Sequence, residues 1–192
     1  MNYFSQAGLY LVQVVFGFYT LLVLLRLLFQ LVRADFYNPF SQFIVTLTQP
    51  PLKILRRFIP GFFGIDFATV VLLLAIQVVE VFLITWLRGI TPSVAGVIVL
   101  ACAELIGLTV WVYIISILVR VILSWVNPYG TSHPVADLLY SLTEPMLAPA
   151  RRLIPPISGL DLSPIAVLVL LQLTLILIVR PLTDVGYALM LQ

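Results

Sequence analysis

The sequence predicts an all-α membrane protein, with four transmembrane helices in two parallel helix-loop-helix repeats and interfacial amphipathic helices between them. Three observations lead to this fold class. Of the 192 residues, 62% are hydrophobic and 9% are charged, with a mean hydropathy of +1.16, whereas a soluble domain has about 25% charged residues. Four apolar runs are long enough to cross a lipid core of about 30 Å. A long segment of the chain also recurs 95 residues further on.

The four apolar runs predict the membrane-spanning segments in order. They are helical because the lipid core has no water to hydrogen-bond an open backbone. The third run is longer than one crossing requires, so we expect it to tilt, protrude or bend near Gly107. This composition excludes a cytosolic enzyme, a nucleic-acid binder and a disordered scaffold, which all need more water-facing charge. The runs cover residues 9–32, 67–87, 94–126 and 164–190.

The basic residues predict the orientation of the helices. The turn between the second and third runs holds only Arg88, whereas the two longer loops are rich in Lys and Arg. Because basic loops stay on the cytoplasmic side, we expect both long loops in the cytoplasm and both termini outside. No basic residue precedes Arg26, so the N-terminus lacks the positive region of a signal peptide and the first run should stay in the mature protein.

An internal repeat sets the organisation of the chain. The segment LTQPPLKILRRFIPGFFGID aligns without gaps to LTEPMLAPARRLIPPISGLD at an offset of 95 residues. Allowing one extra residue places Arg26 onto Arg120, so the repeat includes the preceding helix. We therefore expect two units, residues 1–92 and 93–192. Each contains two crossings, so both start on the same side of the membrane and an axis along the membrane normal relates them.

Each unit also contains a predicted interfacial segment, at residues 39–60 and 134–155. Phe40, Phe43, Ile44 and Leu47 have helical spacing, and the second segment repeats it. After a proline break, basic residues occupy one face, where they could bind anionic headgroups or an acidic partner. The positive-inside signal alone is the alternative explanation. The candidate lipid- or partner-binding residues are Lys53, Arg56, Arg57, Arg151 and Arg152.

These motifs carry a family resemblance. The doubled order of NP or HP, then LTxP, RRxIP and GxD before an apolar helix resembles the YggT family, also called YlmG. The resemblance covers nearly the whole chain and implies a multi-pass protein of the bacterial inner membrane. It also implies a link to osmotic-stress tolerance, to membrane or division organisation, and to cytochrome-complex maturation. It implies no shared enzymatic activity.

Polar residues inside the apolar runs are the candidates for an ion path. Such residues are costly in lipid and are normally paired or face water. They could line a route for a cation between the helices, or they could simply hydrogen-bond one helix to another. Both explanations stay open at this stage. The residues are Glu80, Glu104, Gln77, Gln172, Arg26 and Arg120.

The GxD motifs predict structural roles. We expect Asp66 and Asp161 to cap the helices that follow them, with pairing to the neighbouring arginines as a compatible alternative. Gly64 and Gly159 permit the turn before each aspartate. Pro60 and Pro155 end the preceding helices.

No enzyme signature is present in the sequence. His133 is the only histidine and Cys102 the only cysteine, so we expect no catalysis, no metal and no cofactor. The expected partners are anionic lipids, other membrane proteins and possible further copies of this chain, and not nucleic acid. The sequence thus favours a membrane scaffold or assembly protein. The alternative is a small potassium or proton channel or transporter that uses the intramembrane carboxylates.

Overall fold

A computed structural model describes residues 3–61, 64–126, 134–154 and 161–190 of the chain. Throughout these ranges the regular structure is helical. Four helical stretches are long and apolar enough to span a membrane, and the last of them consists of α6, a π-helical turn η1 and α7. The elements are α1 (Tyr3–Leu31), α2 (Pro39–Leu55), α3 (Phe67–Leu87), α4 (Val94–Val126), α5 (Pro134–Leu153), α6 (Ser163–Thr174), η1 (Leu175–Val179) and α7 (Arg180–Met190).

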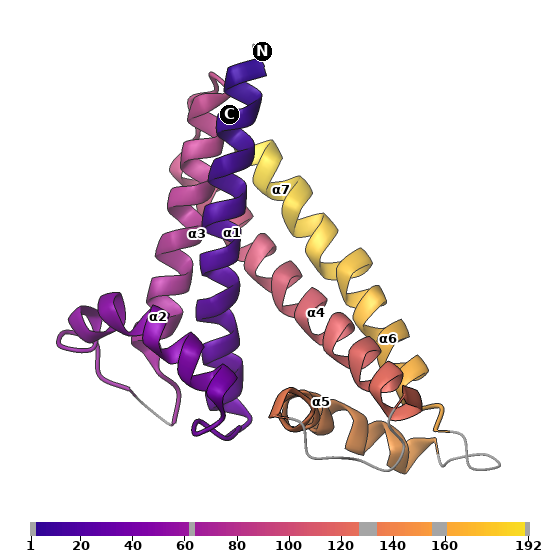
Figure 1. The fold of residues 1–192 in the computed structure, drawn as a ribbon. Helices are drawn as coiled ribbons and strands as arrows, with labels where there is room; N and C mark the ends of the chain where they lie inside the picture. Colours follow the sequence, from indigo (N-terminus) through magenta and orange to yellow (C-terminus); the bar gives the residue numbers. More distant parts are fainter. Residues whose placement is uncertain (1–2, 62–63, 127–133, 155–160, 191–192) are drawn as a thin grey trace.

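The long helices form two pairs (Figure 1). α1 packs on α3, α4 packs on α6 and α7, and the contact between α3 and α4 joins the pairs. The pairs meet near the two termini and splay apart toward the opposite end, where α2 and α5 lie across the bundle. α1 and α4 both run toward that end. The two halves therefore have the same order and direction, as the parallel repeat predicts.

Two residues mark where the fourth stretch departs from a simple helix. The Arg180 N–H bonds to the carbonyl of Leu175, five residues back, instead of four. Pro181 explains this change, because a proline has no N–H and its ring clashes with the carbonyl four residues earlier. The apolar pattern predicts the span correctly but does not reveal this π turn. α4, in contrast, is one unbroken helix, inclined to α1 in Figure 1.

Glycines bring α4 and α7 into close contact. A Cβ at Gly186 would lie 2.6 Å from Cγ of Leu100, and one at Gly96 would lie 2.7 Å from Cγ of Met190. Gly107 has a similar role, since a Cβ there would lie 3.3 Å from Val179. We expected the long third run to tilt, protrude or bend near Gly107. The structure shows close helix packing at this glycine, within one continuous helix.

The interfacial helices differ in detail from the prediction. The helix does not break at the prolines: Pro50 and Pro51 lie inside α2, and Pro145 and Pro149 lie inside α5. Fully buried residues on both sides of the prolines, including Thr48 and Leu52 in α2, hold the helix against the bundle. α2 then ends at Leu55, so Pro60 does not end it as predicted.

Candidate functional site

A buried arginine connects α1 to the interfacial helix α2. Arg26 is 6% exposed. Its Nη1 donates to Oγ1 of Thr48 at 2.8 Å and to the carbonyl of Val45 at 3.2 Å, and its Nη2 donates to Oε1 of Gln49 at 2.7 Å. The Thr48 hydroxyl in turn donates to the Ile44 carbonyl. The arginine therefore has partners for both terminal nitrogens, which offsets the cost of burying its charge.

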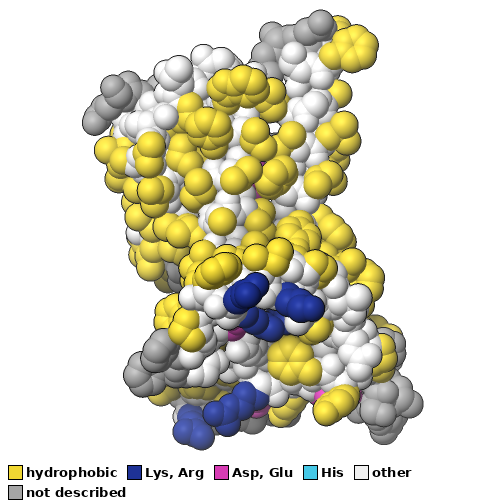
Figure 2. All heavy atoms as spheres, turned by 90° about the vertical axis from the view of Figure 1, so that its left-hand side faces the viewer, with side chains coloured by type: hydrophobic (Ala, Val, Ile, Leu, Met, Phe, Trp, Pro, Cys, Tyr) yellow, Lys and Arg dark blue, Asp and Glu magenta, His cyan; other side chains and the backbone are white. Residues whose placement is uncertain are grey.

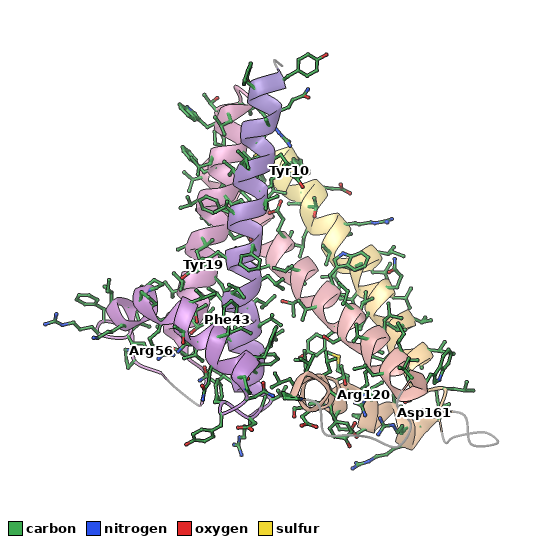
Figure 3. All side chains as sticks on the ribbon, in the orientation of Figure 1. Tyr10, Tyr19, Phe43, Arg56, Arg120 and Asp161 are labelled. Atoms are coloured by element: carbon green, nitrogen blue, oxygen red, sulfur yellow. The ribbon has the colours of Figure 1, made fainter. Side chains whose placement is uncertain are left out.

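The second repeat builds the same connection from α4 to α5. Arg120 donates from Nη1 to Oγ1 of Thr143 at 2.7 Å and from Nη2 to Oε2 of Glu144 at 2.8 Å. Its guanidinium also lies 4.3 Å from the ring centroid of Tyr140, a cation–π contact. We call these two constellations the arginine clamps. Each consists of one transmembrane arginine with the Thr-Gln or Thr-Glu pair of its LTxP motif. Figure 3 labels Arg120 of the second clamp, close to α5.

A second arginine in each repeat pairs with the aspartate of the GxD motif. Arg56 donates to Oδ2 of Asp66 from Nε at 3.0 Å and from Nη2 at 2.5 Å. Arg151 donates from Nε to Oδ2 of Asp161 at 2.9 Å. These ion pairs connect the C-terminal end of each interfacial segment to the start of the spanning helix that follows it.

The two repeats differ in how these groups are connected. Glu144 accepts from Arg120 and also from Arg151, at 2.9 Å, so the second repeat holds one continuous network. In the first repeat Gln49 takes the place of Glu144, and the Arg26 clamp stays separate from the Arg56 pair. A neutral amide and a carboxylate at equivalent positions therefore give the two clamps different charge.

The carboxylates of these networks are ionised at neutral pH. Burial raises the pKa of Asp66, but hydrogen bonds from Arg56 and Thr69 outweigh it and hold that pKa below its ordinary value. Burial likewise raises the pKa of Glu144, and its hydrogen bonds from Arg120 and Arg151 lower it further than burial raises it. The contact of Arg120 with Glu144 in the second clamp and the pair of Arg56 with Asp66 thus join two ionised groups at physiological pH.

The aspartates only partly follow the capping prediction. Asp161 accepts from the backbone N–H of Ser163 at 2.9 Å, as a cap should. Asp66 occupies the N-cap position of α3 but makes no side-chain cap bond to the backbone. Its carboxylate is engaged by Arg56 and by the Thr69 hydroxyl, 2.6 Å away. Asp66 thus holds the predicted cap position, and the arginine pairing that is compatible with capping is present in both repeats.

The remaining motif residues are placed as follows. Gly64 has a φ of +78°, which a turn requires and which glycine adopts without strain. Its carbonyl accepts from Nε2 of Gln30 at 3.3 Å. The predictions for Pro155, Gly159 and His133 lie outside the described residues.

Three basic side chains of the interfacial segments remain unpaired. Lys53, Arg57 and Arg152 are exposed, and within the described ranges no carboxylate lies at ion-pair distance from them. Figure 2 shows a patch of basic side chains below a broad belt of hydrophobic ones. Of the five predicted lipid- or partner-binding residues, these three are available for outside contacts, whereas Arg56 and Arg151 are used internally.

The predicted ion-path residues are brought together only in part. Gln77 donates from Nε2 to Oε2 of Glu104 at 2.6 Å, a bond that joins α3 to α4. It also donates to Oε2 of Glu80 at 3.2 Å within α3. Glu104 also lines a small pocket of about 90 Å³, together with Gln13 and Arg88. Arg26 and Arg120 belong to the clamps and not to this cluster. Gln172 lies exposed on α6, away from it.

No metal centre is found in the part of the chain that the structure describes: no three His, Cys, Asp or Glu residues are grouped. The functional residues that sequence reasoning missed are the clamp partners, Thr48 and Thr143 with Gln49 and Glu144. The signal that could have identified them was the LTxP motif itself, present in both copies.

Comparisons with known proteins agree with this doubled architecture. An uncharacterized protein of Pseudomonas aeruginosa is 44% identical over 178 residues, which cover 92% of this chain and 90% of the relative. An uncharacterized protein of Vibrio alginolyticus is 43% identical over 169 residues, covering 85% and 88%. The uncharacterized protein YggT of Escherichia coli strain K12 is 38% identical over 165 residues, 84% of each chain. No solved structure matches.

The CCB3/YggT family model matches residues 5–87 and again residues 99–182. The two matches contain the two clamps and the two GxD motifs in the same order. The resemblance noted from the motifs is therefore confirmed. This chain belongs to the CCB3/YggT family.

Proposed function

We propose that the protein is a membrane scaffold that presents a basic platform on the cytoplasmic surface of the bacterial inner membrane. Both termini lie on the outer side in this proposal. One observation carries it: two clamps hold α2 and α5 against the bundle, while Lys53, Arg57 and Arg152 remain exposed and unpaired among the described residues. The platform binds anionic lipid headgroups, recruits other membrane proteins, and performs no catalysis.

The clamps make this platform rigid. In each repeat a single spanning helix holds the interfacial helix through two side-chain hydrogen bonds, and the buried face of α2 adds Ile44 and Leu52. A juxtamembrane Lys or Arg contributes about 1 kcal/mol of attraction to an anionic membrane surface. Three exposed cations therefore contribute about 3 kcal/mol toward anionic headgroups.

The test is lipid enrichment around the reconstituted protein. The Lys53→Gln, Arg57→Gln double variant is compared with an Arg88→Gln, Arg180→Gln control, which removes the same charge from residues nearer the termini. Energy transfer from tryptophan to dansyl-labelled phosphatidylglycerol should fall in the first variant and stay unchanged in the control. Equal transfer in all three proteins, with intact folding, contradicts the platform.

The process served is the second part of this proposal. Osmotic-stress tolerance and membrane or division organisation are the processes that the family resemblance implies. Growth at high osmolarity of a strain lacking the gene should be restored by the native chain and by the control variant. The Lys53→Gln, Arg57→Gln variant should not restore it.

The polar cluster of α3 and α4 supports a second candidate function. Gln77 bridges two carboxylates, and Glu104 lines a small pocket together with Gln13 and Arg88. A potassium or proton channel or transporter would use such groups. The discriminating experiment is cation flux through proteoliposomes, comparing the native chain with Glu80→Gln, Glu104→Gln. Flux that disappears in the variant favours transport, and silence in both favours the scaffold.

A further inference from the structure

We propose that the lipid-facing side of α6 around Gln172 binds α1 of a second copy of this chain. In this assembly α6 of one copy and α1 of the next repeat the contact that α3 and α4 make inside each chain. The internal repeat, the exposure of two polar side chains and the arrangement of the helices lead to this inference. Each is taken in turn.

The repeat assigns matching positions to the two contacts. Gln77 corresponds to Gln172 at the offset of 95 residues, and Glu104 corresponds to Tyr10 at the offset that places Arg120 onto Arg26. The clamps support this second offset, because both arginines donate from Nη1 to the threonine of their own LTxP motif. The counterpart of the Gln77–Glu104 contact is thus a contact between Gln172 and Tyr10.

The structure shows that the first contact is made and that the second is not. Nε2 of Gln77 lies 2.6 Å from Oε2 of Glu104. Gln172 is exposed and, among the described residues, has no side-chain hydrogen bond, while Tyr10 is 65% exposed. Within one chain α1 packs on α3 and α6 packs on α4 (Figure 1), so the helices that carry Tyr10 and Gln172 have other packing partners.

The chemistry of the two side chains is complementary. An amide that faces lipid at a membrane-spanning position lacks the partners that water would supply. A tyrosine hydroxyl can both donate to and accept from that amide. The fourth spanning stretch is also the least covered of the four: 17% of its most apolar window is buried, against 33–39% for the others. A second copy supplies a hydrogen-bond partner for Gln172 and buries part of the exposed surface of the fourth spanning stretch.

The contact is head-to-tail, because two different surfaces of the chain meet. This gives a specific cross-linking test in a Cys102→Ala background. Tyr10→Cys and Gln172→Cys are placed on separate, differently tagged chains and expressed together in membranes, and an oxidant is added. We expect disulfide-linked dimers that contain both tags. Each single variant expressed alone should give none, since two identical positions do not meet.

A matched control shows that the reaction works at this depth. Gln77→Cys and Glu104→Cys in one chain should form a disulfide within the monomer, visible as altered mobility without a dimer. If the control disulfide forms and no mixed dimer is found, the proposal is overturned. A dimer from Gln172→Cys alone would also overturn it, because α6 would then meet α6. A disulfide within a single Tyr10→Cys, Gln172→Cys chain would likewise overturn it, because the two residues would then meet inside one copy.

Discussion

Replacement of Glu144 by Gln tests whether the second clamp is a charged network. The substitution puts into the second repeat the side chain that Gln49 provides in the first. Glu144 lies 2.8 Å from Arg120 and 2.9 Å from Arg151, and its side chain is 25% exposed. A partly exposed ion pair contributes about 0.5–1 kcal/mol. Loss of two pairs should therefore lower the free energy of unfolding by about 1–2 kcal/mol at pH 7.

The direction of the Glu144 pKa shift determines how the stabilisation by this network depends on pH. The pKa of Glu144 in the folded chain is below its ordinary value of about 4.3. A depressed pKa means that the stabilisation is fully present above the unfolded-state pKa and is lost as pH falls through the folded-state pKa. The difference between native and Glu144→Gln proteins should thus stay constant from about pH 8 to about pH 6 and shrink below about pH 4.

Unfolding in detergent micelles, followed by tryptophan fluorescence at pH 7 and at low pH, measures this difference. The control is Gln49→Glu, which places a carboxylate beside the buried Arg26 and isolates the effect of charge at the equivalent site. We expect a stabilisation below about 1 kcal/mol there, because desolvation offsets the attraction. A change below about 0.3 kcal/mol for Glu144→Gln, or a difference that persists in acid, would refute the network.

Three further predictions concern packing, pairing and topology. Gly186→Ala should destabilise the chain by about 1–3 kcal/mol, because its Cβ would meet Leu100 at 2.6 Å; Gly107→Ala, with a nearest contact of 3.3 Å to a side-chain methyl, should cost less in the same unfolding assay. Asp66→Asn should release Arg56 and increase phosphatidylglycerol enrichment in the energy-transfer assay, and an unchanged signal would mean that the ion pair does not compete with lipid. Reporter fusions should place both termini outside, and a cytoplasmic terminus would overturn the loop assignment.

The spans could be predicted well because hydropathy reports directly on transfer into lipid. The second and third runs coincide with α3 and α4, and the fourth begins one residue earlier than predicted. The π turn could not be predicted from hydropathy, because it depends on the backbone bonding that Pro181 forbids. The helix ends near Pro60 were also missed. Prolines inside α2 are tolerated where buried neighbours hold the helix, and local sequence does not show this.

The candidate site was predicted through its charges and not through its contacts. Arg26 and Arg120 were recognised as costly in lipid and were grouped with Glu80 and Glu104. They instead donate to two hydroxyls, an amide and a carboxylate that lie 22–24 residues away in the chain. Such pairings depend on how the interfacial helix crosses the spanning helix. A neutral Thr48 carries no signal of its own in a composition or hydropathy argument.

Residues that are identical in the two repeats differ in their contacts from residues that are not identical. Arg26, Thr48 and Asp66 have identical counterparts, and their side-chain hydrogen bonds lie within their own repeat. Asn38, which donates to the carbonyl of Pro134 in the other repeat, is replaced in the second copy by His133. This is expected physically, because a contact inside a repeat requires a matching hydrogen-bond group in both copies, as the acceptors Gln49 and Glu144 provide, whereas a contact between the repeats places a different requirement on each copy.

Gln77 is the exception to this rule. It hydrogen-bonds to α4 across the junction between the repeats, yet its counterpart Gln172 is also glutamine although its side chain has no hydrogen-bond partner among the described residues of its own chain. A lipid-facing glutamine is unfavourable at a position where leucine would suffice. The identity is explained if Gln172 meets the same kind of surface as Gln77 does, and Tyr10 of a neighbouring copy supplies that surface. The departure from the repeat rule and the uncovered face of α6 thus lead independently to the same contact.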